Sequence, residues 1–543
     1  MFGAVANFLA CSPATEDLLQ TTFPYQVPQG ISAETLLTQT KILASDEFEG
    51  RAPGSPGEDK TIAFLTKQFS SLGLVPGNPN GDWVQSVPLV GITPLQGDTL
   101  VATASGMVSR MLNPGVDYVA WTKHVTEEVE IDAEFVFVGY GAVAPEYDWD
   151  DFKDVDVSNK ILLFLVNDPP LENIFEGDAM TYYGRWTYKH EIAAERGAAG
   201  SFVIHESDSA GYPWEVVGSH PHGESFDLVS ADQNLSRVPV EGWLQRSAAK
   251  MLFDLAGLDF EEMKLRASER SFRPVPLGVT GETRIRNTMR TIDSQNFIAK
   301  LEGNDKPDEF VIYVAHWDHL GMDDQLSGDQ IFNGAADNAT GTAGLIELAR
   351  AFTQTAKQLR RSILFLAVTA EEQGLLGSKH YSENPLYPVA STVAAINMDV
   401  LNTWGRTRDL TIVGMGQSEL DLIATEVANN LGRVLNADPE PEKGFYYRSD
   451  HFSFAKVGIP AFYADPGINY LNKSERYGIE KREEYTIENY HKPSDEVKPD
   501  WDLSGAIEDL MFHYYLGLKL ASGSEWPEWS QTSEFRAIRE TQR

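Results

Sequence analysis

The stretch that decides the fold is Glu309–His319, EFVIYVAHWDH, in which an apolar run ends at two histidines and an aspartate. Its apolar part has the length and the β-branched and aromatic content of a buried strand. Similar segments lie at Ser362–Thr369 and Val393–Met398, and helix-like periodicity covers Thr342–Gln354. Alternating strands and helices are typical of a mostly parallel sheet with helices on both faces. We therefore predict an α/β fold built around such a sheet.

Residues of the types that bind zinc lie in short segments of the C-terminal half. They are His316, Asp337, Glu372, Asp399 and His491. Two imidazoles and three carboxylates are the donors that a two-metal hydrolase needs. Ligands of such sheets bind beyond the carboxyl ends of the strands, where His316, Glu372 and Asp399 are predicted to lie. A metal site is therefore predicted at this edge.

Neighbouring residues have chemistry that supports these five. Glu371 precedes Glu372, so one carboxylate can bind metal while the other accepts a proton from an attacking water. Asp318 is close enough in sequence to orient the His316 imidazole, and Asp495 stands in the same relation to His491. Tyr490 can donate its hydroxyl to a developing oxyanion. Each of these signals is weak when taken alone.

The order His, Asp, Glu-Glu, Asp, His, with these neighbours, resembles the co-catalytic zinc exopeptidase family that includes bacterial leucyl aminopeptidases and glutamate carboxypeptidases. The resemblance covers about residues 32 to 520. It implies that Asp337 bridges two zinc ions. His316 and Asp399 would complete one zinc site, and Glu372 and His491 would complete the other.

The same resemblance implies a mechanism. A metal-bridging water attacks a peptide carbonyl, and Glu371 is the general base that passes the proton to the leaving amine. Tyr490 matches a tyrosine that assists in some members of the family. A cis peptide bond after the bridging aspartate, here Asp337-Asn338, is also common among them.

The segment 444–452, GFYYRSDHF, resembles the part of that family whose loops line the substrate pocket. A packed aromatic loop is the alternative. The candidate pocket residues are Tyr446, Tyr447, Arg448, Asp450 and His451. Among the other histidines, His319 is expected behind the ligands or at the surface, and His380 is expected on an exposed helix face.

The predicted function is that of a di-zinc metallo-aminopeptidase, a zinc metallopeptidase that removes N-terminal residues from peptides. A carboxypeptidase of the same family would share every ligand and differ in its pocket, where a basic patch would bind the C-terminal carboxylate. A glutaminyl cyclase-like transferase would use one zinc and a less complete ligand set. A receptor that has lost ligands is disfavoured because all five ligands and Glu371 are present.

Length indicates more than one domain, because 543 residues exceed the usual size of a single core. In the middle of the chain, strand-like and helix-like segments include Val138–Gly141 (VGYG) and Arg196–Gly200 (RGAAG). These two phrases resemble the protease-associated domain, a small β-rich α/β module inserted in exopeptidases. We predict an N-terminal region at 1–30, a zinc peptidase domain at 31–124 and 281–543, and the inserted domain at 125–280.

Charge and cysteine content limit the kinds of partner and of cross-link that the protein can have. A net charge of −36 argues against nucleic acid or an anionic membrane as the main partner. The single cysteine, Cys11, rules out an internal disulfide framework. Met1–Cys11 resembles the end of a bacterial lipoprotein signal, which predicts a secreted, periplasmic or outer-membrane-anchored protein held only through a lipidated Cys11. The alternative is a loosely ordered N-terminus with an inert cysteine. The sequence does not predict the oligomeric state.

Overall fold

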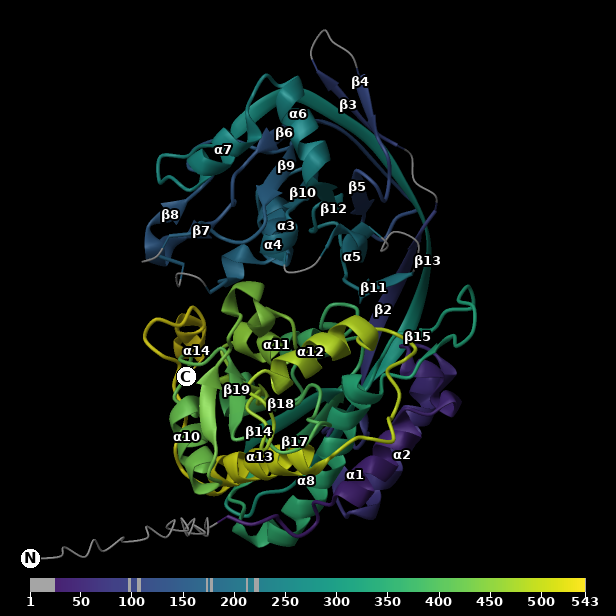
Figure 1. Ribbon diagram of the computed structural model, residues 1–543, viewed down its shortest axis with the longest axis vertical. Coiled ribbons are helices and arrows are strands. Elements are labelled where there is room, and N and C mark those ends of the chain that lie inside the picture. The colour runs from purple at the N-terminus through teal and green to yellow at the C-terminus, as the bar shows by residue number, and fades with distance from the viewer. Residues whose placement is uncertain are drawn as a thin grey trace, which may run out of the picture.

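The computed structural model describes residues 25–95, 99–104, 109–171, 174–175, 179–210, 213–218 and 224–542. These residues form two parts, which Figure 1 shows one above the other. The lower part contains the first helices and the C-terminal half, and the upper part contains most of the segment between them. Cys11 and the signal-like stretch around it lie outside the described residues.

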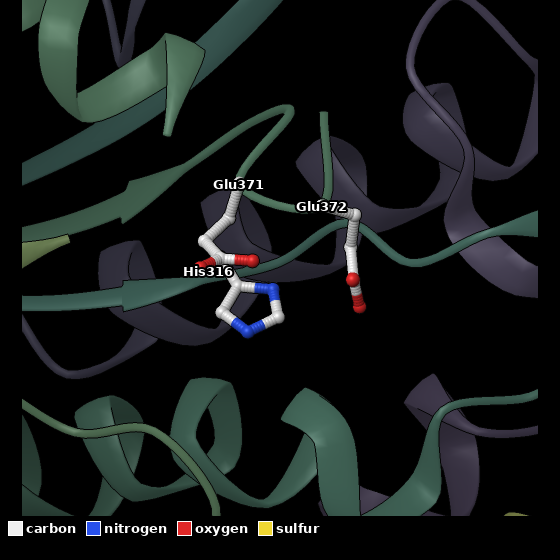
Figure 2. A group of neighbouring side chains, drawn as sticks. All are labelled: His316, Glu371 and Glu372. Carbon is white, nitrogen blue, oxygen red and sulfur yellow. The ribbon is translucent and has the colours of Figure 1, made fainter. Parts of the chain in front are cut away.

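A mostly parallel sheet forms the centre of the lower part, as predicted. Four strands run parallel in the order β17 (Arg361–Val368), β14 (Lys306–His316), β18 (Thr392–Asn397) and β21 (Ala461–Pro466). Antiparallel strands flank them, with β13 (Val275–Leu301) beside β17 and β19 (Asp409–Val413) beside β21, and β20 (Val434–Ala437) follows β19. Because β14 and β17 run parallel, His316, Glu371 and Glu372 lie at the same edge of the sheet (Figure 2).

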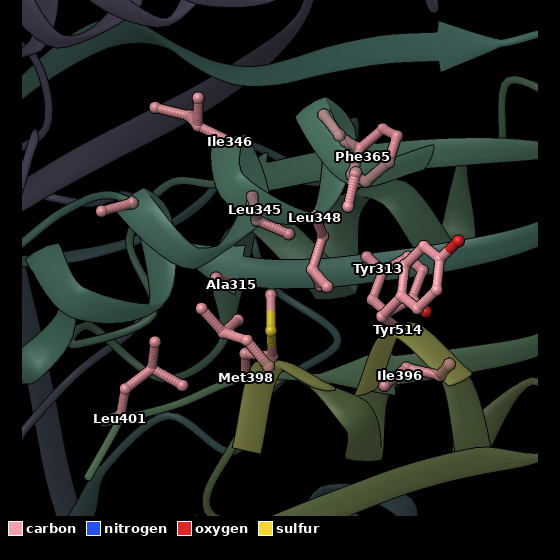
Figure 3. Packing of buried hydrophobic residues seen from close by; sticks show 14 of the residues in the cluster. Tyr313, Ala315, Leu345, Ile346, Leu348, Phe365, Ile396, Met398, Leu401 and Tyr514 are labelled. Atoms are coloured by element: carbon pink, nitrogen blue, oxygen red, sulfur yellow. The ribbon is translucent and has the colours of Figure 1, made fainter. Parts of the chain in front are cut away.

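Side chains of β14 alternate between two cores, as the two-residue period of a strand requires. Tyr313 and Ala315 belong to one cluster of buried residues, whereas Ile312 and Val314 belong to the cluster on the opposite face. Figure 3 shows the first of these cores, where Tyr313 and Ala315 lie among side chains that include Leu345, Leu348 and Phe365. A strand that is buried on both faces explains the unbroken apolar run in the sequence.

Helices cover both faces of this sheet. One face carries α1 (Ala33–Leu43), α2 (Pro56–Ser71), α8 (Gly341–Thr355), α10 (Leu420–Asn430) and α13 (Ser504–Ser522). The other carries α9 (Leu376–Glu383) and α11 (His451–Lys456). The Ser55 hydroxyl caps α2, accepting from the backbone of Gly57 and Glu58, which is why that helix begins at Pro56.

The upper part has a second sheet with its own core. Its strands are β3 (Leu100–Ala104), β4 (Ser109–Leu112), β5 (Tyr118–Trp121), β6 (Glu128–Phe137), β9 (Ile161–Leu165), β10 (Gly200–His205) and β12 (Glu241–Gln245). Its main helices are α3 (Trp186–Glu195), α6 (Arg246–Leu255) and α7 (Phe260–Ala267). Aromatic rings of Phe137, Phe253 and Phe260 pack against one another inside it. This sheet begins at Leu100, before the predicted boundary at residue 125, and its assignment as a protease-associated domain stays a prediction.

One long strand belongs to both sheets. β13 pairs with β6 up to Arg286, with β2 (Val84–Pro94) over 287–297, and then with β17. Figure 1 shows it curving from the top of the upper part into the lower part. The predicted domain border at residue 281 therefore lies inside a continuous strand rather than in a linker.

The remaining elements are short or peripheral. They are β1 (Val75–Pro76), β7 (Val143–Ala144), β8 (Trp149–Asp150), β11 (Ser225–Leu228), β15 (Gly321–Met322), β16 (Ile331–Phe332), α4 (Ser207–Ala210), α5 (Trp214–Gly218), α12 (Tyr477–Glu488) and α14 (Arg536–Gln542). Over the described part of the chain, every helix is too short or too polar to cross a membrane.

Candidate active site

The five predicted ligands meet at the carboxyl edge of the central sheet. His316 ends β14, Glu372 follows β17, and Asp399 follows β18. Asp337 comes from the loop before α8, and His491 from the loop after α12. Loops from distant parts of the sequence thus bring together the residues that the sequence analysis singled out.

One group of donors is formed by His316, Asp337 and Asp399. His316 Nε2 lies 3.2 Å from Asp337 Oδ1 and 3.2 Å from Asp399 Oδ1. One donor atom from each of the three residues lies within 4.8 Å of the others. Burial alone would lower the pKa of His316, but the carboxylates of Glu371, Asp399 and Asp337 raise it well above its ordinary value. A buried imidazole with several carboxylates around it is suited to binding a cation.

A second group shares Asp337 with the first. His491 Nε2 lies 2.9 Å from Glu372 Oε2 and 3.5 Å from Asp337 Oδ2. Asp337 therefore presents one oxygen to each group. Burial and the charge of Asp337 would raise the pKa of Glu372, but His491 and His319 lower it to about 2. A carboxylate with one oxygen in each of two donor groups has the geometry of a bridging ligand.

The loop that carries Asp337 is fixed by polar contacts. The peptide bond Asp337-Asn338 is cis, as the family resemblance implies. The Asn338 side chain donates to the Met398 carbonyl at 3.0 Å and accepts from the Gly341 backbone at 2.9 Å. These bonds tie the loop both to the segment before Asp399 and to the start of α8. The loop is therefore held in place independently of any ligand.

Asp318 and Asp495 both lie at the site, and the contacts of Asp495 differ from the prediction. The Asp318 backbone carbonyl lies 3.1 Å from His316 Nδ1, and its carboxylate Oδ1 lies 3.8 Å from the same nitrogen. The Asp318 carboxylate also accepts from the Glu371 backbone at 3.1 Å. The Asp495 carboxylate accepts from the backbone of Ala336 and of Asp337, each at 3.1 Å, and not from His491. Both acids accept from backbone N–H groups of loops that carry predicted ligands, and such groups need a partner when they are buried.

Glu371 occupies a strained, well-anchored turn. Ala370 before it has a φ of 51°, in the left-handed region that residues with a side chain rarely adopt. The Glu371 carbonyl accepts from the backbone of Gly374 at 2.8 Å and of Leu375 at 2.9 Å. Burial, together with the charges of Asp399, Glu372 and Asp450, raises the pKa of Glu371 well above its usual value, and His316 opposes this shift. Its carboxylate lies with His316 and Glu372 in a third group of neighbouring donor atoms (Figure 2).

Tyr490 lies at the rim of the site. Its ring stacks on that of His491 with centroids 3.8 Å apart, and 44% of the residue is exposed. The position agrees with a hydroxyl that reaches a substrate from the solvent side.

The five candidate pocket residues divide into two kinds. Tyr446, Tyr447 and His451 are buried, and the His451 ring packs on Tyr446 with centroids 4.8 Å apart, which fits the packed aromatic loop. Arg448 lies over the Phe445 ring at 5.3 Å. Asp450 is buried beside the donor groups, and burial raises its pKa to about 7 although His316 opposes this. Within this loop, Asp450 is a residue whose charge raises the pKa of Glu371.

Three further residues contact the site, and of these only His319 was named from the sequence, as a residue behind the ligands or at the surface. Ser449 donates to Asp399 Oδ2 at 2.7 Å, and His319 Nδ1 lies 2.6 Å from Glu372 Oε1. The buried Arg51 donates to backbone carbonyls on both sides of the site, including Trp317 at 2.8 Å and Gly334 at 2.9 Å. The structure places His319 behind Glu372, which is one of the two positions expected for it. Arg51 gave no signal, since it lies far away in the sequence.

Arg51 is expected to stabilise the loops that carry the ligands. Its guanidinium also donates to the carbonyls of Leu43 and Asn333, each at 2.7 Å. Arg51→Met would leave several buried carbonyls without a donor, so we expect the free energy of unfolding to fall by about 3 kcal/mol or more. Urea unfolding of the variant would measure this loss. An Arg51→Met protein as stable as the wild type would contradict this role.

Comparison with known proteins finds similar peptidases. Residues 296–515 match the model of peptidase family M28. Aminopeptidase NAALADL1 of Mus musculus is 33% identical over 130 residues, which are 23% of this chain and 16% of that protein. A probable zinc metalloprotease of Pyrenophora teres f. teres is 25% identical over 213 residues, 33% of this chain and 44% of that protein. The chain thus spans less than half the length of these curated relatives.

Among solved structures, the aminopeptidase from Aneurinibacillus sp. strain AM-1 aligns with 92% of this chain and 96% of its own, with a TM-score of 0.52 and 19% identity. This likeness shows a common fold. The family match runs from the end of β13 into α13 and includes every predicted ligand. The part of this chain that is similar to peptidase family M28 is therefore residues 296–515.

Proposed function

We propose that this protein is an aminopeptidase that uses two zinc ions to remove N-terminal residues from peptides. The observation that carries the proposal is the position of Asp337, whose two oxygens face His316 Nε2 at 3.2 Å and His491 Nε2 at 3.5 Å. One carboxylate between two donor groups supports two ions rather than one. The names of the relatives, a zinc metalloprotease and aminopeptidases, support both the metal and the reaction.

The residues at the site fit zinc. Imidazole nitrogen and carboxylate oxygen are ordinary zinc ligands, and a catalytic site keeps a position open for water or substrate. His316 and Asp399 would hold one ion, Glu372 and His491 the other, and Asp337 both. Bound zinc would supply Lewis-acid polarisation of the substrate carbonyl and would lower the pKa of water.

Glu371 carries the proton in the proposed reaction. Its carboxylate accepts a proton from the attacking water and passes it to the nitrogen of the leaving amine. The contact between the Glu371 backbone and Asp318, and the backbone bonds of the turn after it, hold the carboxylate in place. Tyr490, whose ring stacks on His491, would donate its hydroxyl to the developing oxyanion.

The acids outside the ligand set bear on which end of a peptide is bound. Glu371 and Asp450 lie beside the donor groups, whereas the charges of Asp337, Glu372 and Asp399 would be balanced by the ions. A carboxylate that faces the substrate attracts the ammonium group of a peptide N-terminus and repels a C-terminal carboxylate. Together with the name of an aminopeptidase among the relatives, this favours an aminopeptidase over a carboxypeptidase with the same ligands.

The end of the peptide that is attacked can be determined directly. We expect the zinc-loaded protein to shorten an unblocked peptide and a C-terminally amidated peptide from the N-terminus, and to leave an N-acetylated peptide intact. Mass-spectrometric sequencing of the products would also reveal the side-chain preference. Trimming from the C-terminus, blocked only by amidation, would instead indicate a carboxypeptidase. Cyclisation of a peptide with N-terminal glutamine, without hydrolysis, would indicate a cyclase.

Secretion or envelope anchoring through Cys11 is part of this proposal and rests on the sequence of residues 1–11 alone. Metabolic labelling with a fatty acid, compared between the wild type and Cys11→Ser, would test it.

A further inference from the structure

His319 is a buried histidine that the five-ligand arrangement does not use. It is 1% exposed, and its Nδ1 lies 2.6 Å from Glu372 Oε1. Its other ring nitrogen, Nε2, is buried without a hydrogen-bond partner. The contact with Glu372, a candidate ligand, is the side-chain hydrogen bond that the structure shows for this buried ring, and buried polar groups with one nitrogen unpaired require an explanation.

The two oxygens of Glu372 face different imidazoles. Oε1 faces His319 Nδ1 at 2.6 Å, and Oε2 faces His491 Nε2 at 2.9 Å. The His319 and His491 rings are 5.9 Å apart and nearly perpendicular, so they approach the carboxylate from separate directions. If Nδ1–H of His319 donates to Oε1, only Oε2 remains directed at the Asp337 and His491 side of the site.

The number of ligands distinguishes two functions for His319, that of a fourth zinc ligand and that of a hydrogen-bond donor to Glu372. Asp337, Glu372 and His491 already offer three protein donors on this side. A fourth protein ligand would fill a tetrahedral zinc, which is the arrangement of structural sites, whereas catalytic sites keep one position open. A hydrogen bond from His319 to the ligand Glu372 leaves that position open and fixes the direction of the carboxylate.

The surrounding loop is shaped to place this ring. The His319 backbone N–H donates to the Arg51 carbonyl at 3.3 Å. Gly334 forms the wall beside the ring and has a φ of 53°; a Cβ there would lie 2.5 Å from Cγ of His319. Only a glycine at this position allows the ring to lie against the loop that carries Asp337.

We propose that His319 is a positioning residue that donates Nδ1–H to Glu372 Oε1 and thereby holds Glu372 for single-oxygen binding of the ion shared with His491 and Asp337. This inference rests on the proposed function, because it assigns a purpose to a residue behind one of its metal ligands.

Two amide substitutions test which nitrogen of His319 matters. The side-chain amide of Asn places an N–H near the position of Nδ1, whereas that of Gln places it near the position of Nε2. We expect His319→Asn to bind both ions with wild-type affinity, and His319→Gln and His319→Ala to bind one of them about 10- to 100-fold more weakly. His380→Asn, on α9 outside the site, is the matched control and should bind as the wild type does.

The measurement is made on the full chain and does not depend on turnover. Zinc per chain is determined after dialysis against buffers of graded free zinc, and the absorption of the cobalt-substituted proteins reports the geometry of the remaining site. Thermal unfolding of the metal-free variants identifies any that fail to fold. Rescue by Asn together with loss by Gln supports the proposal when the two metal-free variants unfold at similar temperatures, because packing is then matched and the amides differ in which ring nitrogen they replace.

Other outcomes overturn it. Better zinc binding by His319→Gln than by His319→Asn would make Nε2 a direct ligand. Wild-type zinc affinity in all three variants would show that His319 has no part in the site. Wild-type protein that binds two ions in either case keeps the proposed function intact. Wild-type protein that binds no ion would overturn the function and this inference together.

Discussion

Replacing Glu371 by Gln is expected to lower kcat by about 10²- to 10⁴-fold while both zinc ions stay bound. Gln has nearly the same shape and keeps the backbone bonds of the turn, including the contact of the Glu371 N–H with Asp318 at 3.1 Å. It cannot accept the proton from the attacking water. The loss should therefore fall on kcat, with a smaller change in KM.

The residue beside it is the matched control. Glu372→Gln changes the same functional group one position along the chain, but it removes a carboxylate that faces His491 Nε2 at 2.9 Å. We expect this variant to lose zinc, and to regain part of its activity when zinc is added in excess. Metal analysis and steady-state kinetics on both proteins would separate the two functions. A fully active Glu371→Gln protein would exclude Glu371 as the general base.

Replacing Asp337 by Ala is expected to remove both ions and to lower turnover by at least about 10⁴-fold, since each of the two donor groups loses one of its three members. The loss arises because Asp337 Oδ1 and Oδ2 face different imidazoles. No other single substitution in the site removes a donor from both groups.

Zinc per chain after dialysis is the direct measurement for this variant. Asp421→Ala, on α10 away from the site, should keep its zinc and its activity. An Asp337→Ala protein that still binds one ion with wild-type affinity would show that the two groups do not share this carboxylate.

Much of the site was predictable because its residues follow the strands directly. A strand buried on both faces is an uninterrupted apolar run, so β14 and β18 could be recognised from the sequence, and His316 and Asp399 mark where each run stops. In a parallel sheet the carboxyl ends of such strands lie at one edge, so residues far apart in sequence could be placed together.

The contacts of supporting residues could not be predicted in the same way. Asp495 was expected to orient its near neighbour His491, but it accepts from the backbone of Ala336 and Asp337, whose position depends on how two distant loops meet. The Arg51 contacts with Trp317 and Gly334 are likewise long-range. Local spacing predicts partners within one loop and carries no information about these contacts.

The long strand β13 was missed for a different reason. Residues 277–287 alternate between buried and exposed positions, as a strand that is covered on one face should. However, the buried positions include Gly281, Thr283 and Asn287 as well as apolar residues, so the hydrophobic alternation is weak. The predicted domain border at residue 281 lies in this stretch, where the weak alternation gives little sign of a strand.

The continuity of β13 limits how the upper part can be removed or replaced. A module that is joined by two loops can be exchanged by cutting those loops. Here a cut within 275–286 divides the part of β13 that pairs with β6, and a cut within 287–297 divides the part that pairs with β2. A shortened enzyme would need a redesigned strand end as well as a new connection. A pulling force on the upper part would likewise pass along β13 and through its pairing to β17, and the carboxyl end of β17 leads into the turn of Glu371.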